Sequence, residues 1–116
     1  MQIADHFCEQ ILLEKWKAGD RIPSVREMAV SVEVNPNTVM RTFNYLQEQG
    51  IIFNKRGIGY FVADDGFEKT KALKKKDFIT QELPAFFKAM SLLNLSIEDI
   101  KQYYQQYLDH QTKNKQ

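Results

Sequence analysis

Apolar and polar residues alternate with helical spacing over the first part of the chain. Ile3, Phe7 and Ile11 recur every four residues, so they would share one face of a helix. This pattern predicts a first helix from about Gln2 to Trp16, and Gly19 is expected to end it. The single apolar stripe indicates a helix that packs on a core and leaves its other faces in solvent.

Two short helices with strong start signals are predicted next. Ser24 opens a capping box, and Asn35 followed by Pro36 has the pattern of an N-cap with proline in the first helical turn. Gly50 is suited to end the second of these helices. Two helices separated by a tight turn predict a helix-turn-helix over about residues 24–44.

A glycine-containing hairpin is predicted directly after these helices. Residues 51–55 and 59–63 are rich in apolar and aromatic side chains, and Gly57 and Gly59 lie in or beside the connection between them. This hairpin, about residues 51–63, would be the wing of a winged helix-turn-helix. The sequence therefore predicts a mainly α fold with a small β-hairpin, and a first domain that covers residues 1–65.

Residues 66–116 have the pattern of a separate helical region. Pro84 is expected to kink or split the first long helix near residues 81–83, and Ser96 is expected to cap the last helix. We expect this region to be a two-helix dimerisation appendage.

An apolar and aromatic face along these helices exceeds what two helices can bury between them. We expect it to form a twofold interface between copies of the chain, although it could instead pack on the chain's own first domain. The expected interface residues are Phe78, Phe86, Phe87, Met90, Ile100, Tyr103, Tyr104 and Tyr107.

The overall charge alone does not indicate a nucleic-acid partner. The 116 residues carry a net charge of +1, and residues 1–65 hold seven Lys and Arg against nine Asp and Glu, a balance of −2. The few cations are nevertheless placed where a winged helix meets DNA. Arg26 and Arg41 belong to the two predicted helices, and Lys55 and Arg56 belong to the wing tip.

The second helix of a helix-turn-helix enters the major groove, so polar side chains on its first turns can contact base edges. Arg41 could form a two-pronged contact with guanine, while cations at the wing would reach a minor groove or a phosphate. Taken singly, these residues could equally serve as caps, turn glycines or solvated charges. The expected DNA-binding residues are Ser24, Arg26, Asn35, Pro36, Asn37, Thr38, Arg41, Lys55, Arg56, Gly57 and Gly59.

The order of these motifs resembles the winged helix-turn-helix of the GntR family of bacterial transcription regulators. Residues 19–29, 34–41 and 57–62 carry the resemblance, which covers residues 2–63, and residues 34–39 look most like the YtrA-type subfamily. The resemblance implies a homodimeric repressor that binds double-stranded DNA at a palindromic operator. Its short subfamily has a two-helix appendage, whereas most of the family carries a large effector or aminotransferase-like domain. The family often has arginine at the position of Pro36.

Other functional classes find less support. We recognise no paired carboxylates, phosphate-binding glycine loop or nucleophile with a base, so the chain is not expected to be an enzyme or to need a cofactor. Cys8 is the only cysteine and the two histidines are isolated, so no metal site is predicted. No membrane segment is expected, a cytoplasmic location is the default, and any small-molecule effector is unknown. The alternative is a winged-helix protein-interaction module, which would more often show an apolar recognition helix.

Overall fold

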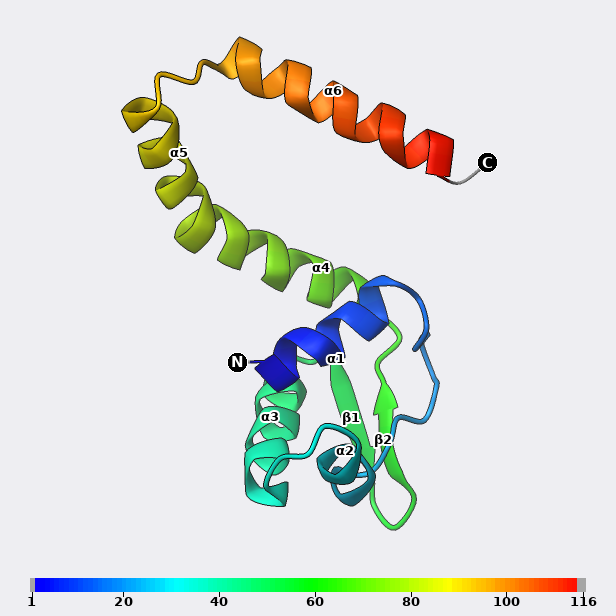
Figure 1. Cartoon of the computed structure of the whole chain (residues 1–116). Coiled ribbons are helices and arrows are strands. Elements are labelled where there is room, and N and C mark those ends of the chain that lie inside the picture. The colour runs from blue at the N-terminus through cyan, green and yellow to red at the C-terminus, as the bar shows by residue number, and fades with distance from the viewer. Residues whose placement is uncertain (1, 115–116) are drawn as a thin grey trace. The chain divides into compact units, whose positions relative to one another are not determined.

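The computed structural model describes residues 2–114, which fold as two compact units that meet between Lys76 and Asp77. The first unit therefore extends past the boundary at residue 65 that the sequence suggested, and the outermost residues of both expected domains lie outside the described part. The elements, labelled in Figure 1, are α1 Gln2–Leu12, α2 Val25–Ser31, α3 Pro36–Glu48, β1 Ile52–Lys55, β2 Gly59–Val62, α4 Gly66–Asp77, the π-helical turn η1 Phe78–Glu82, α5 Leu83–Leu92 and α6 Ile97–Asn114.

Aromatic rings from three elements meet in the core of the first unit. Phe43 on α3 packs edge-on against Phe7 of α1 at 5.5 Å and against Tyr60 of β2 at 4.8 Å between ring centroids. Trp16 packs on Phe7 in the same way at 4.7 Å. Phe7 and Phe43 are fully buried together with Ile11, Val39, Leu46 and Ile51. These contacts fix α3 and the hairpin on one scaffold, because each fully buried side chain of this size contributes about 1.5–3 kcal/mol.

The predicted end of the first helix at Trp16 is wrong, since α1 ends at Leu12. Glu14 adopts a left-handed conformation with φ 59°, and the Lys15 N–H donates to the Gln10 carbonyl at 3.0 Å. This is a Schellman ending with glutamate at the position where glycine is usual. The chain turns back four residues early, and the turn brings the Trp16 ring onto the core.

The predicted helix-turn-helix signals are confirmed in atomic detail. The Glu27 N–H donates to Ser24 Oγ and the Ser24 N–H donates to Glu27 Oε1, both at 3.1 Å, which completes the capping box. These bonds from Ser24 hold the pKa of the Glu27 carboxyl below its ordinary value. Asn35 Oδ1 accepts from the Asn37 N–H at 2.8 Å and begins α3. Gly50, at φ 75°, ends that helix as predicted.

The wing is an antiparallel hairpin in which Ile52 pairs with Val62 and Lys55 pairs with Gly59. A third extended segment joins it, because Arg21 bridges to Phe61 and the residues beside that bridge exchange hydrogen bonds with β2. The bridge anchors the base of the wing to the loop that precedes α2.

The helix α4 packs closely on the rest of the first unit. A Cβ atom at Gly66 would lie 2.8 Å from both the Ile51 carbonyl oxygen and Val62 Cγ1, so only glycine fits here without rearrangement. Further along α4, Lys74 Nζ lies 2.6 Å from Asp5 Oδ1 on α1. The hydrogen bond from Lys74 is the main reason why the pKa of Asp5 lies below its ordinary value of 3.8.

This ion pair makes a pH-dependent contribution to the stability of the first unit. A lowered folded pKa means that the contribution is complete above pH 3.8 and is lost as the pH falls through the folded value. We expect Asp5→Asn to lower the free energy of unfolding by about 0.2–1 kcal/mol at neutral pH, because the Asp5 side chain is largely exposed. Chemical unfolding at pH 7 and about pH 2 measures the difference. Glu9→Gln, an exposed acid on the same helix, is the control. If the loss of unfolding free energy in Asp5→Asn persists unchanged in acid, the ion pair with Lys74 is not its cause.

The second unit contains the irregularity that proline predicted. The expected kink near residues 81–83 takes the form of the π-helical turn η1, where the Leu83 N–H donates to the Phe78 carbonyl, and Pro84 then lies at the start of α5. Ser96 caps α6 as predicted. Its Oγ accepts from the Asp99 N–H at 3.1 Å, and its own N–H donates to the Asp99 carboxylate at 2.9 Å.

Candidate nucleic-acid interface

The start of α3 presents a polar surface to solvent. Asn37, Thr38 and Arg41 are exposed on its first turns, while Val39 and Phe43 are buried behind them. Capping by Asn35 and the buried face together fix the rotation of the helix. Figure 1 shows α2, the start of α3 and the hairpin tip at the same end of the first unit. The helix-turn-helix and the wing therefore offer polar residues from one end of this unit.

The arginines of the two helices are not neutralised within the described chain. Arg26 on α2 and Arg41 on α3 are exposed, and neither forms an ion pair with any residue among 2–114. Glu27, the acid next to Arg26, uses its carboxylate to cap α2. Arg26 forms no ion pair with Glu27, and both guanidinium groups are available to a phosphate or a base.

The wing places its two cations differently. Arg56 and Gly57 are exposed in the turn between β1 and β2, as expected for a wing tip. Lys55 instead holds its ammonium group over the aromatic rings of Phe61, at 4.7 Å, and of Phe53, at 5.9 Å. The two rings stack at 5.8 Å on the outer face of the hairpin. Cation–π attraction thus positions the Lys55 charge above this face.

Arg21 is a candidate that the sequence reasoning missed. A Cβ atom at Gly59 would lie 3.0 Å from Arg21 Nε, so the guanidinium stem rests on the glycine backbone at the start of β2, next to the turn of the wing. Arg21 is also close enough to Glu27 to help lower the pKa of that carboxyl. No local motif reveals this position, because it arises from the bridge between Arg21 and Phe61.

The expected dimer residues lie mostly on exposed faces of the second unit. Tyr103, Tyr104 and Tyr107 are each about 60% exposed on α6, and Tyr104 and Tyr107 stack at 6.5 Å between ring centroids. The phenylalanines at 78, 86 and 87 are also exposed. Met90 differs from the expectation: only 8% of it is exposed, so it supports the unit from within and does not offer its surface to a partner. Ile100 is half-buried.

Two other kinds of site are absent from the described part of the chain. Residues 2–114 contain no group of three or more His, Cys, Asp and Glu side chains arranged to hold a metal ion. In the same range, no helix combines the length and apolarity needed to cross a membrane.

Comparison with known proteins identifies the family. Residues 1–62 match the family described as "Bacterial regulatory proteins, gntR family". This chain belongs to the gntR family. Its winged helix-turn-helix is the DNA-binding domain of a transcription regulator, so the resemblance suggested by the sequence is confirmed, as is the mainly helical fold with a small hairpin.

Individual relatives agree with this assignment. The chain is 39% identical over 102 residues to the HTH-type transcriptional regulator YhcF of Bacillus subtilis, covering 86% of this chain and 81% of that protein. It is 36% identical over 81 residues to the HTH-type transcriptional repressor YtrA of the same organism, covering 70% and 61%. A crystal structure from Bacteroides thetaiotaomicron, described as a GntR-family regulator, is similar with a TM-score of 0.78 and 44% identity, covering 95% and 96%. The family and these relatives are described as transcription regulators.

Proposed function

We propose that this gntR-family chain is a sequence-specific repressor that binds a palindromic operator as a homodimer in the cytoplasm. The observation that carries the proposal is the exposed start of α3, which bears Asn37, Thr38 and the unpaired Arg41. It lies at the same end of the first unit as the tip of the wing (Figure 1). An acid-free polar surface of this kind suits base edges and phosphates better than it suits an apolar protein partner. The repressor role is supported by similarity to YtrA, which is named a repressor.

The proposed contacts divide into two kinds. Asn37, Thr38 and Arg41 would contact base edges in the major groove, and Arg41 has the reach for a bidentate contact with guanine. The remaining predicted residues would bind or approach the backbone: the capping residues at 24, 35 and 36, Arg26 on α2, and wing residues 55–57 and 59. Phosphate contacts set the register of the protein on the duplex, whereas the base contacts provide specificity.

A homodimer is proposed because one winged helix makes few contacts with DNA. Two copies on one duplex gain from effective concentration, and a twofold protein matches a palindromic site. The second unit supplies a surface for this purpose. Its exposed tyrosines and phenylalanines form an aromatic face of the type that is enriched at interfaces between subunits.

Arg21 is proposed to brace the wing in this complex. Its side chain rests on Gly59, so removing it would leave the hairpin less restrained beside its turn and would take away a positive charge near the DNA backbone. We expect Arg21→Ala to weaken DNA binding several-fold and equally for all sequences, with a smaller dependence on salt. Titration of operator and scrambled DNA at two salt concentrations measures this. A selective loss on operator alone would instead assign Arg21 to base recognition.

The function as a whole is tested by fluorescence anisotropy with the DNA upstream of the protein's own gene, against a scrambled duplex. The proposal predicts tight, salt-sensitive binding to the first duplex that saturates at two chains per site. Equal, weak binding to both duplexes would contradict an operator at that position. Absence of binding even at low salt would favour the protein-interaction module instead.

A further inference from the structure

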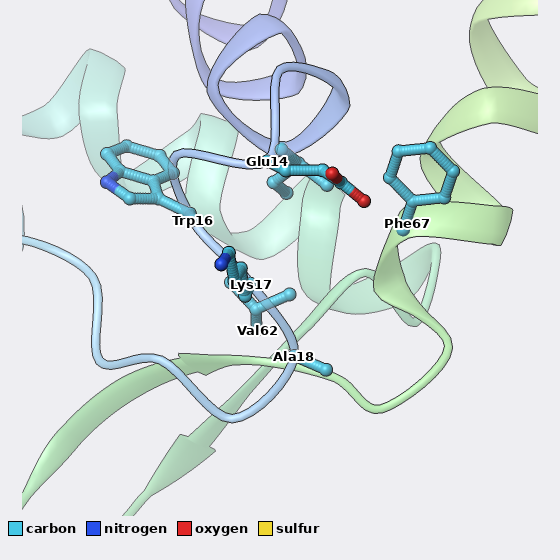
Figure 2. Close-up of a pocket in the computed structure, with 7 residues that line it drawn as sticks. Glu14, Trp16, Lys17, Ala18, Val62 and Phe67 are labelled. Carbon is cyan, nitrogen blue, oxygen red and sulfur yellow. The ribbon is translucent and has the colours of Figure 1, made fainter.

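The first unit contains a cavity of about 270 Å³ at the side of the core, formed by the loop after α1, the end of β2 and the first turn of α4. Figure 2 shows the Glu14 carboxylate reaching from the loop toward the Phe67 ring of α4. The cavity is lined by Ile11, Glu14, Trp16, Lys17, Ala18, Val62 and Phe67. Its volume lies just below the usual range for ligand sites, about 300–1,000 Å³, so it suits only a small occupant.

The walls and the rim of this cavity differ in chemistry. Trp16 and Phe67 are partly exposed and supply apolar surface, with the buried Ile11 and Val62 behind them, and more of the lining is apolar than polar. Glu14 and Lys17 add one negative and one positive charge, and both side chains are solvent-accessible. An occupant that matches this lining has an apolar body and carries both an ammonium and a carboxylate group.

Hydrogen bonds from backbone N–H groups fix the loop that carries both charged residues. Glu14 occupies the left-handed position of the Schellman ending at φ 59°, and the Lys17 N–H donates to the Asp20 carboxylate at 2.8 Å. The Gly19 N–H donates to the Val62 carbonyl at 2.9 Å, which ties the loop to β2. A left-handed glutamate costs about 1–3 kcal/mol, and such positions cluster where ligands are held. The site is thus preorganised, which reduces the ordering needed for binding.

We propose that this cavity binds a small zwitterion with an apolar side chain, such as an aromatic or branched-chain α-amino acid. The ammonium group pairs with Glu14, the carboxylate pairs with Lys17, and the side chain lies against Phe67. None of the residues that line the site is among those proposed to contact DNA. Because Phe67 belongs to the first turn of α4, the occupant also contacts the helix that leads into residues 77–116.

The chain contains its own reporter for this site. Trp16 is the only tryptophan and it lines the cavity, so its fluorescence responds to an occupant. Three probes share a phenyl ring and differ in the charged groups that they carry. L-phenylalanine carries both an ammonium and a carboxylate, phenethylamine lacks the carboxylate, and phenylpropionate lacks the ammonium. Excitation at the red edge of tryptophan absorption avoids the phenyl rings of the probes.

The full-length protein is expected to give a saturable change with L-phenylalanine at a concentration at least about tenfold lower than with either truncated probe. Glu14→Gln is expected to abolish the preference over phenylpropionate while retaining the preference over phenethylamine. Lys17→Met is expected to abolish the preference over phenethylamine while retaining the preference over phenylpropionate. Lys15→Met removes a neighbouring charge that does not line the cavity, and it should leave all three titrations unchanged.

This crossed pattern separates recognition from a general effect on folding, because a damaged fold would weaken all three probes together. Thermal unfolding of each variant confirms that it is folded before titration. The proposal is overturned if L-phenylalanine gives no saturable change, if the three probes bind equally, or if either charge variant leaves its matched preference intact.

Discussion

Replacing Arg41 with alanine is expected to weaken binding to the operator by about 1–3 kcal/mol, or roughly 5- to 150-fold. The side chain is exposed near the start of α3 and forms no ion pair within the described residues. Its guanidinium group therefore contributes little to the stability of the free protein and is available to a guanine edge. The loss should be larger on operator than on scrambled DNA, because a base contact provides specificity whereas a phosphate contact does not.

Anisotropy titrations of both duplexes at fixed salt measure this effect. Lys15→Ala is the matched control, since it removes one exposed positive charge from the loop after α1, away from α3. The control should bind nearly as the wild type does. Equal losses in the two variants would show that Arg41 acts only through net charge, and unchanged specificity in Arg41→Ala would remove it from base recognition.

Placing a charge in the aromatic face of α6 is expected to separate the proposed dimer. Tyr104 is 60% exposed within its own chain and stacks on Tyr107, so Tyr104→Asp should leave the monomer folded. In a twofold interface the new carboxylate would be buried and would face its copy, which costs several kcal/mol. Loss of the second DNA-binding unit should then lower operator affinity by about 10²- to 10⁴-fold.

Sedimentation velocity of the two variants separates this effect from a change in the surface charge of α6. Gln102→Asp introduces the same charge on the opposite side of that helix, and it should remain dimeric. The proposed interface is contradicted if Tyr104→Asp sediments as the wild type does, or if both variants dissociate to the same extent.

The sequence predicted those helix boundaries that depend on side chains with specific local chemistry. Ser24, Asn35 and Ser96 accept backbone N–H groups whatever surrounds them, and Gly50 takes a left-handed conformation at little cost. Pro84 likewise disturbs any helix that contains it. Because these signals act within a few residues, they can be recognised before the fold is known.

The features that the sequence did not reveal depend on contacts between distant segments. Glu14 and Glu33 take left-handed conformations that their side chains do not favour, so the early end of α1 follows from packing of the loop and not from a local preference. The position of Arg21 on Gly59 requires the bridge to β2. The burial of Met90 depends on tertiary packing, which helical periodicity alone does not fix.

Hydroxyl-radical footprinting of the wild-type protein on its operator tests the central claim most directly. A homodimer that inserts α3 into the major groove predicts two protected half-sites, related by a twofold axis and separated by about 10 base pairs or a multiple of this. Arg41→Ala should reduce the protection of both half-sites to the same extent. A single protected site, or uniform protection without half-sites, would contradict the account of a symmetric, sequence-specific regulator.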